Sequence, residues 1–371
     1  MHEIHDLAEF DHWVGSRAAL DAVVFQGLDL TSRTEVLVSV SCVGATFLGC
    51  RMEPTALDHV IDGGAVVFPR LPDLPFDPYR PRLYSQAELL EGWEPGSGSF
   101  ATDARDSLIH AWSARTPRGT NPPVLDALAQ RLHDHAIDDA LADHLAHRDD
   151  VVAVMGGHSM RRCDAGYRAV AELGRSMQRE GWLVASGGGP GAMEAANLGA
   201  WMASYPDDAL DRAIELLAAE EDFRHADAYL TAGRAVLDEF PAGAESLAVP
   251  TWFYGHEPTN QFATHVAKYF ANSIREDGLL AIATRGVVFA PGSAGTTQEV
   301  FQDATQNHYA VFGNASPMVF LDREFWQQSL PAEPLLRTLA ADRPYSGLIG
   351  TAESAPEAME FLRTHPPITV A

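Results

Sequence analysis

Lysine is almost absent from the sequence. Among its 371 residues only Lys268 is a lysine, although lysine and arginine together number 26. A pyridoxal-phosphate enzyme holds its cofactor as a Schiff base on a lysine. Lys268 lies between Ala267 and Tyr269 in a stretch that predicts the middle of a helix. We therefore do not expect a pyridoxal-phosphate enzyme, and the sequence predicts no other cofactor and no metal site.

Positive charge, cysteine and long apolar runs are scarce as well. The formal net charge of −25 argues against nucleic acid or an anionic membrane as a partner. The 3 cysteines lack the spacing of a metal site, which predicts free thiols in a reducing, cytoplasmic protein. We expect neither a signal peptide nor a membrane-spanning segment, because no charged start with an apolar run and no stretch of sufficient length is present.

The first 150 residues carry few functional signals. Residues 1–120 are typical of an irregular, β-rich region, to which the sequence assigns no role. Within it, Phe25–Leu30 and Ala45–Cys50 resemble two turns of a pentapeptide-type β-coil, although a repeat fold needs at least three copies. Residues 121–150 predict a connecting helix, with an apolar stripe on one face and a histidine- and aspartate-rich face that we expect to be solvated.

The remainder, residues 151–371, alternates short apolar runs with helical patterns. This alternation predicts an α/β fold, a doubly wound, Rossmann-like parallel sheet, with the N-terminal β-rich region as an addition. The expected strands are Val151–Met155, Trp182–Ser186, Leu247–Phe253, Gly286–Ala290 and Met318–Leu321. The expected helices include Tyr167–Glu180, Ala192–Ser204, Thr259–Ile282 and Pro356–Arg363.

One glycine turn has the pattern of a phosphate site. Pro291–Glu299, Pro-Gly-Ser-Ala-Gly-Thr-Thr-Gln-Glu, follows an apolar strand and opens a helix. Gly292 and Gly295 permit a tight turn and a close approach of a ligand. Thr296 and Thr297 lie where free N–H groups and the positive end of the helix dipole bind phosphate. Glu299 lies one turn into the helix, beside the expected phosphate. A plain strand-to-helix loop is the alternative interpretation.

Two further turns strengthen the phosphate interpretation. Gly187–Gly191 follows a strand and opens a helix that carries Met193 and Glu194, and Gly156–Ser159 follows the first strand. The carboxyl ends of parallel strands meet at one edge of the sheet, so the three turns can converge on one crevice. Folds that bind NAD usually place an acidic residue near the end of the second strand, where it bonds to the ribose. No such residue is present here, so NAD is disfavoured as a ligand. The predicted binding residues are Gly156, Gly157, Ser159, Gly188, Gly189, Gly191, Glu194, Gly292, Ser293, Gly295, Thr296 and Thr297.

These motifs resemble the LOG family of phosphoribohydrolases and the related nucleotide 5′-monophosphate nucleosidases. The family signature is Pro-Gly-Gly-x-Gly-Thr-x-x-Glu, and Ser293 replaces its second glycine here. The resemblance covers about residues 150–365. It implies a LOG-type fold, a homodimer or larger homo-oligomer, and hydrolysis of a nucleoside 5′-monophosphate to free base and ribose 5-phosphate. The signature is matched at Pro291, Gly292, Gly295, Thr296 and Glu299.

The resemblance also implies the catalytic residues. The family uses the glutamate of the signature and an arginine on the preceding helix, which correspond to Glu299 and Arg275. The family's Arg-Lys pair is Arg-Glu here, with Glu276 next to Arg275, and the spacing to the signature is one residue longer. Arg285 is therefore a second candidate. On spacing alone, an ion pair with a neighbour is the commoner fate of a helix arginine such as Arg275.

Two other functions remain open on the same fold. One is a nucleotide sensor without catalysis, and the other is a carrier of a phosphorylated cofactor such as molybdopterin. Glu299 favours the enzyme, because a carboxylate repels the phosphate of a ligand that is only bound. His256 and Glu257 follow a strand and are candidates to touch the base, whereas His308 lies too far along its helix and is expected to pack.

Overall fold

The computed structural model describes residues 2–16, 19–117 and 119–370, which form two compact units. Unit 1 contains residues 1–83 and 116–144, and unit 2 contains residues 84–115 and 145–371. Each unit is described by itself. Within the described ranges, no helix combines the length and the apolar character needed to cross a membrane.

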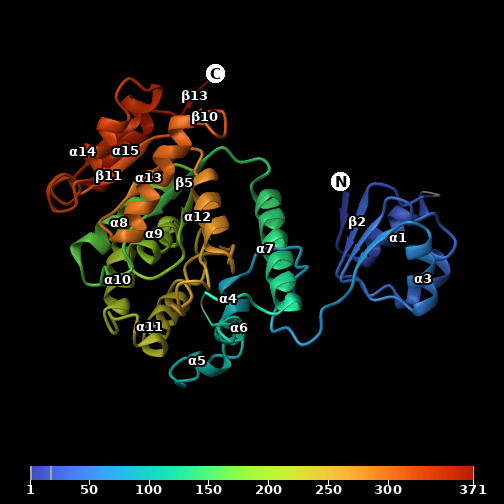
Figure 1. The fold of residues 1–371 in the computed structure, drawn as a ribbon. Helices are drawn as coiled ribbons and strands as arrows, with labels where there is room; N and C mark the ends of the chain where they lie inside the picture. The colour runs from blue at the N-terminus through green and yellow to red at the C-terminus, as the bar shows by residue number, and fades with distance from the viewer. Residues whose placement is uncertain (1, 17–18, 118, 371) are drawn as a thin grey trace. The chain divides into compact units, whose positions relative to one another are not determined.

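Unit 1 is built around a small parallel sheet (Figure 1). Its four strands pair in chain order, and equivalent positions of neighbouring strands are 21, 22 and 20 residues apart. This is a short coil of strand-containing turns, of which the sequence pattern had indicated only two. Phe25 and Phe47 stack in its interior with ring centroids 4.9 Å apart. The strands are β1 His2–Ile4, β2 Val23–Gln26, β3 Thr46–Leu48 and β4 Val66–Phe68; the helices are α1 Leu7–Gly15, α2 Thr34–Leu37, α3 Pro54–Asp62 and α7 Val124–Leu145.

Unit 2 contains a seven-stranded sheet in which every neighbouring pair is parallel. The α/β fold class predicted from the sequence is confirmed. The four strands Val151–Met155, Leu183–Ser186, Gly286–Phe289 and Met318–Leu321 are buried at every position and, apart from Ser186, apolar, as expected where helices cover both faces. In spatial order they are β12 Ile349–Ala352, β11 Met318–Leu321, β9 Gly286–Phe289, β5 Val151–Met155, β6 Leu183–Ser186, β7 Ser246–Ala248 and β8 His265–Val266.

The strand order reverses between β5 and β9. From β5 the chain winds outward through β6, β7 and β8, and then returns to the other side of β5 to place β9, β11 and β12. Right-handed crossovers in opposite directions put the helices of the two halves on opposite faces and leave a crevice at the reversal. The crevice therefore lies between the turn after β5 and the turn after β9.

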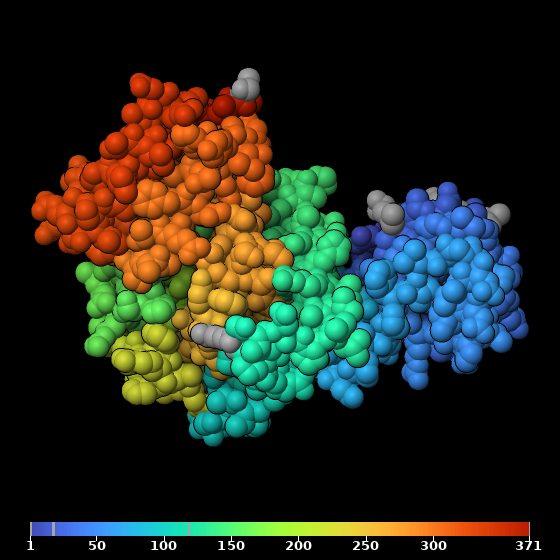
Figure 2. Space-filling model, viewed as in Figure 1, coloured from blue at the N-terminus to red at the C-terminus, as the bar shows by residue number. Residues whose placement is uncertain are grey.

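The helices of unit 2 pack on one another in groups, one of which is α10 with α11. Helices α8, α9 and α15 pack together, and α12 packs on α13, which in turn contacts α14. Helices α12 and α13 lie side by side on the face of unit 2 seen in Figures 1 and 2. Their bounds are α8 Ala165–Arg179, α9 Ala192–Trp201, α10 Asp207–Leu217, α11 Ala226–Glu239, α12 Asn272–Ala281, α13 Ala294–Tyr309, α14 Ala332–Leu339 and α15 Ala355–Thr364.

The long helix predicted over Thr259–Ile282 is wrong. Only Asn272–Ala281 is helical, as α12, whereas the earlier part contains a turn and extended chain that includes β8. Phe262, Val266 and Phe270 are four residues apart, a spacing that fits one face of a helix and also the same face of a strand. Lys268 consequently lies in extended chain and not in the middle of a helix.

Segment 84–115 groups with the large sheet and not with the N-terminal region that precedes it. Tyr84 forms an antiparallel bridge with Val266 of β8, and Asp106 is completely buried in unit 2. The sequence had grouped residues 1–120 as one region, because the Pro- and Gly-rich stretches on either side of this segment hide its packing. Its helices are α4 Gln86–Leu89, α5 Phe100–Asp103 and α6 Arg105–Ser113.

Candidate functional site

Three glycine turns meet at the carboxyl ends of β5, β6 and β9. Gly157 N donates to Pro291 O at 3.0 Å, and Ala192 N donates to Gly157 O at 3.2 Å, so the turn after β5 is bonded to both of the others. A Cβ on Gly191, whose φ is +72°, would collide with Gly157 O. The glycines therefore serve the close packing of the three turns as well as access for a ligand.

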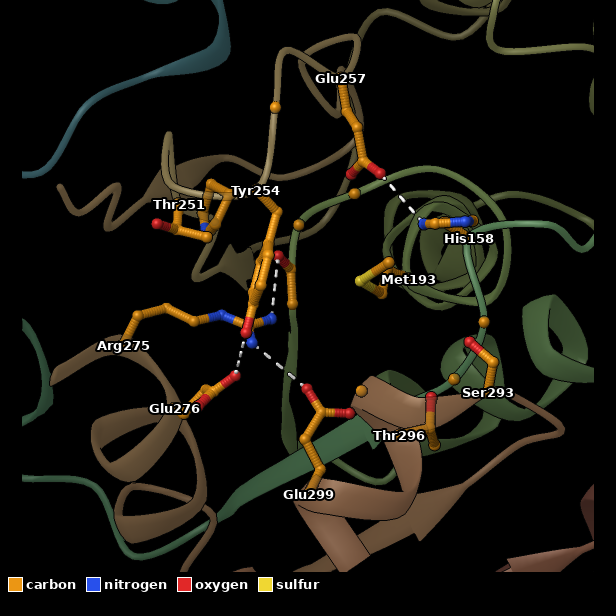
Figure 3. Close-up of a pocket in the computed structure, with 18 of the residues that line it drawn as sticks. His158, Met193, Thr251, Tyr254, Glu257, Arg275, Glu276, Ser293, Thr296 and Glu299 are labelled. Atoms are coloured by element: carbon orange, nitrogen blue, oxygen red, sulfur yellow. Dashed lines mark hydrogen bonds and ion pairs between the residues drawn. The ribbon is translucent and has the colours of Figure 1, made fainter. Parts of the chain in front are cut away.

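A pocket of about 440 Å³ opens where the turns meet (Figure 3). This volume falls within the roughly 300–1,000 Å³ of small-molecule sites. Nine of the predicted residues line it: Gly156, Gly157, Gly188, Gly189, Arg275, Ser293, Gly295, Thr296 and Glu299. The convergence of the three turns that the sequence predicts is thus present in the structure.

The N-terminus of α13 forms one wall of this pocket. Ser293 caps the helix without a side-chain hydrogen bond of its own, and Ala294, Gly295 and Thr296 follow it along the pocket. The first N–H groups of a helix have no acceptor within the helix, and they carry the positive end of its dipole. This wall can bind an anionic group such as phosphate, despite the negative charge of the whole chain.

Arg275 and Glu299 face each other at the pocket (Figure 3). Arg275 Nη1 lies 3.3 Å from Glu299 Oε1, and Arg275 Nε donates to Val249 O at 2.8 Å. A longer contact of 3.5 Å joins Arg275 Nη2 to Gly187 O. Burial raises the pKa of Glu299 above its usual value, and Arg275 opposes that rise. The arrangement fixes a buried carboxylate beside the anion-binding wall.

A second carboxylate is held at the mouth of the pocket. Glu276 Oε1 accepts a hydrogen bond from Tyr254 Oη at 3.2 Å, and Glu276 Oε2 accepts one from Gln298 Nε2 at 2.6 Å. Asn272 Nδ2 donates to Tyr254 Oη at 2.8 Å. These bonds orient Tyr254, which is 60% exposed and offers an aromatic face to a bound ring.

An ion pair between two loops, formed by His158 and Glu257, also lines the pocket. His158 Nδ1, from the turn after β5, lies 3.1 Å from Glu257 Oε1, and Met193 lies beneath the pair (Figure 3). Glu257 raises the pKa of His158 above its usual value, with burial acting against it. Glu257 thus reaches the pocket, as the sequence suggested, through a partner that the sequence did not reveal.

Five predicted binding residues do not line the pocket. Gly191 and Gly292 shape the turns from behind, and Thr297 Oγ1 donates to Ser293 O at 3.0 Å. Ser159 lies in a neighbouring pocket of about 370 Å³. The fifth, Glu194, is 3% exposed and belongs to a buried cluster.

Glu194 stabilises the fold beside the site. Its two oxygens accept hydrogen bonds from Arg162 Nη2 at 2.6 Å and Arg162 Nε at 3.0 Å. Tyr167 Oη and Tyr229 Oη also donate to it, at 2.9 and 2.5 Å. Both of its oxygens accept hydrogen bonds within the protein, so it ties α9 to α8 and α11.

Two of the other candidates also lie elsewhere in unit 2. Arg285 stacks on Trp182, with the guanidinium carbon 4.8 Å from the ring centroid, and it does not line the pocket. His256 stacks on Phe100, and burial lowers its pKa to about 4. Of the two arginines that the sequence left open, Arg275 is therefore the one at the pocket.

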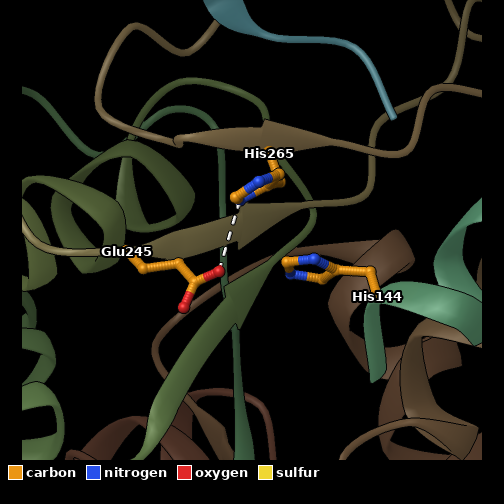
Figure 4. Close-up of side chains that lie close together, drawn as sticks. All are labelled: His144, Glu245 and His265. Atoms are coloured by element: carbon orange, nitrogen blue, oxygen red, sulfur yellow. Dashed lines mark ion pairs between the residues drawn. The ribbon is translucent and has the colours of Figure 1, made fainter. Parts of the chain in front are cut away.

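One acid–histidine pair lies at the other end of the strands (Figure 4). Glu245 directly precedes β7, and His265 begins β8, so both are at the amino ends of parallel strands. Glu245 Oε1 and His265 Nδ1 are 3.6 Å apart, and burial lowers the pKa of His265. This pair is remote from the carboxyl ends, where the glycine turns meet.

Sequence reasoning missed several residues that line the pocket. Tyr254 and Glu276 are brought in by the loop after β7 and by α12, and Met193 by α9. Lys268 also lines it, because the chain around β8 is extended and not helical. Signals were available for Glu276, which directly follows the predicted arginine, and for Met193, which follows the second glycine turn, whereas Tyr254 and Lys268 have no motif of their own.

No protein-family model and no curated protein matches this chain. Among solved structures, it is similar to the molybdenum cofactor binding protein from the phototrophic bacterium Rippkaea orientalis, with 15% identity and a TM-score of 0.39 over 59% of this chain and 98% of that one. It is also similar to the molybdenum cofactor carrier protein from Chlamydomonas reinhardtii, with 17% identity and a TM-score of 0.36 over 58% of this chain and 98% of that one. The α/β class of the chain rests on its own strand order.

Proposed function

We propose that the protein hydrolyses the N-glycosidic bond of a nucleoside 5′-monophosphate and releases a free base and ribose 5-phosphate. The observation that carries the proposal is the buried ion pair of Arg275 and Glu299 beside the free N-terminus of α13. An anion site alone serves any phosphate ligand. A fixed carboxylate next to it is suited to the positive charge that develops on a sugar ring during glycosidic cleavage.

The N-terminal wall of α13 would bind the 5′-phosphate. The N–H groups of Ala294, Gly295 and Thr296 are directed toward the pocket end of the helix, where the dipole favours negative charge. The phosphate then anchors the ribose within reach of Glu299, which lies one turn further along the same helix. Binding energy at the phosphate thereby positions the bond that reacts.

Glu299 would act as an anion on the ribose. As the bond from C1′ to the base nitrogen breaks, its electron pair leaves with the base and C1′ becomes positively charged. The Glu299 carboxylate stabilises this charge or orients the attacking water. The oxygen of water bonds to C1′. One proton of the water is taken up by the departing base, and the other stays in the new hydroxyl group of ribose 5-phosphate.

Arg275 would be a positioning residue for this step. Its guanidinium is bonded to Val249 O and Glu299, which fixes the direction of the carboxylate. Its charge also opposes the effect of burial on the pKa of Glu299 and favours the ionised form. Tyr254, with its exposed ring at the pocket mouth, is a candidate contact for the base.

Product analysis tests the proposal. The purified protein is incubated with a panel of purine and pyrimidine nucleoside 5′-monophosphates, and base, ribose 5-phosphate and inorganic phosphate are separated by chromatography. We expect equimolar base and ribose 5-phosphate without inorganic phosphate. Release of phosphate with an intact nucleoside would contradict a glycosidase. Thermal stabilisation by a nucleotide without any product would favour the sensor or carrier alternative.

A further inference from the structure

The only lysine of the chain borders the candidate pocket in a buried ion pair. Lys268 is 5% exposed and lines the pocket. Its Nζ lies 2.8 Å from Asp106 Oδ1 and 2.9 Å from Asp106 Oδ2. Asp106 is fully buried and comes from α6, in the segment that precedes the sheet. Asp106, which is 162 positions away in the sequence, thus binds the ammonium group of Lys268.

The carboxylate of Asp106 is fully engaged by donors. Trp252 Nε1 donates to Oδ1 at 2.7 Å, and Thr259 Oγ1 donates to Oδ2 at 2.7 Å, in addition to the two contacts from Lys268. Burial opposes the ionisation of Asp106, but Lys268, together with His256 and the hydroxyl of Thr259, outweighs burial and holds the pKa of Asp106 below its usual value. These contacts fix the Lys268 ammonium beside Asp106, in the wall of the pocket that Lys268 lines.

A buried ion pair contributes little net free energy to the stability of a fold. Removing two charges from water costs several kcal/mol per ion, and apolar side chains of similar size often do as well. A lysine ammonium has three N–H donors and no acceptor. The two oxygens of Asp106 accept from two of the three N–H groups of Lys268. The third N–H group remains for a ligand in the pocket. The position thus favours a ligand atom that accepts a hydrogen bond and disfavours one that donates.

We propose that Lys268 recognises the leaving base and selects 6-oxopurine nucleotides over AMP. This rests on the proposed glycosidase function. The remaining donor of Lys268 can bond to O6 of a 6-oxopurine, which is an acceptor, whereas adenine presents the N6 amino donor at that position. N7 is an acceptor in both bases and does not distinguish them. The same donor also stabilises negative charge that develops on the base as its bond to C1′ breaks.

The test compares inosine 5′-monophosphate with AMP, which differ only at position 6 and at the N1 proton. We expect kcat/KM for inosine 5′-monophosphate to exceed that for AMP by about tenfold to a hundredfold. Equal cleavage of both nucleotides would overturn the selection while leaving the glycosidase in place. If neither is cleaved, the glycosidase fails, and thermal stabilisation by the two nucleotides decides the selection: a preference for inosine 5′-monophosphate supports it and equal stabilisation overturns it.

Two variants separate recognition from folding. Lys268→Met alone would leave Asp106 charged and unpaired in the interior, so the matched variant is Asp106→Asn with Lys268→Met. We expect this double variant to lose the preference between the two nucleotides. Lys268→Arg keeps a donor-only cation and is expected to retain the preference. A folded double variant that keeps the full preference would contradict the proposal.

Discussion

Arg275 Nη1 lies 3.3 Å from Glu299 Oε1, and the two side chains are only 8% and 12% exposed. They project from α12 and α13, which pack side by side, and they meet where the chain reverses its winding around the sheet. Burial raises the pKa of Glu299, and the charge of Arg275 counteracts it. The pair therefore controls how much carboxylate is present in the pocket at a given pH.

Replacing the arginine should change the pH dependence of the reaction. In Arg275→Gln the cation that opposes the pKa rise of Glu299 is lost, so the pKa rises further. Because the reaction needs the ionised carboxylate, the acid limb of kcat moves to higher pH, and the rate at pH 7 falls by roughly tenfold or more. A pH–rate profile of variant and wild type measures both effects.

Arg285→Gln is the matched control. Arg285 stacks on Trp182 and does not line the pocket. We expect the variant to keep the pH profile of the wild type, with at most a modest loss of stability. A shift of the acid limb in Arg285→Gln, and none in Arg275→Gln, would reverse the assignment of the two arginines.

A methyl group at Gly187 should disturb the same ion pair. A Cβ there would collide with the guanidinium of Arg275 and lie 2.6 Å from Met193 Sδ. We expect Gly187→Ala to lower kcat by about tenfold or more, because the carboxylate loses its support. Gly278→Ala, on α12 with no atom within 4 Å of its Cβ, is expected to retain activity and to gain about 0.5–1 kcal/mol of stability.

Glu194 is expected to matter for stability and not for catalysis. It is buried with Arg162, Tyr167 and Tyr229 as its partners. Glu194→Gln leaves the buried guanidinium of Arg162 without its counter-charge, which we expect to cost about 3–5 kcal/mol. Urea unfolding measures this cost, and the KM of the folded fraction should stay unchanged. A raised KM with normal stability would place Glu194 at the substrate instead.

Asp303 gives a prediction on pH and stability. It is 2% exposed, its Oδ2 has no hydrogen-bond partner among the described residues, and burial raises its pKa well above the usual value. The stability that the protonated form contributes is complete below the unfolded pKa of about 3.9 and is lost as the pH rises through the folded pKa. An asparagine at this position does not titrate, so the Asp303→Asn variant does not lose free energy of unfolding in this pH range.

The two proteins should therefore diverge with pH. We expect similar free energies of unfolding for Asp303→Asn and wild type near pH 4, and an advantage for the variant that grows by about 1.4 kcal/mol per pH unit above it until the folded pKa is reached. Urea unfolding at a series of pH values measures the difference. A constant difference across the series would mean that Asp303 is ionised in the native protein.

Much of the α/β part could be predicted from the sequence. Val151–Met155 and Met318–Leu321 are apolar runs with clear ends, and both are strands with those bounds. The glycine turn of Pro291–Glu299 lies in the place that its pattern predicts, because strand, turn and helix are local features. Glu299 and Arg275 also line one pocket, as the motif implied.

What could not be predicted depends on long-range packing. The spacing of Phe262, Val266 and Phe270 fits both helix and strand, and pairing of β8 with β7 decides between them. The position of Lys268 follows from that choice. Asp106, its partner, lies in a segment whose place in the large unit has no signature in the sequence.

The catalytic role of Glu299 is tested by measuring base release by Glu299→Gln and the affinity of the same variant for the same nucleotide. Glutamine keeps the size of the side chain and removes its charge. We expect a fall in kcat of roughly a hundredfold or more, while the nucleotide still binds, as measured by calorimetry at the same pH. An unchanged kcat in the variant would contradict a catalytic role for Glu299 and with it the proposed mechanism.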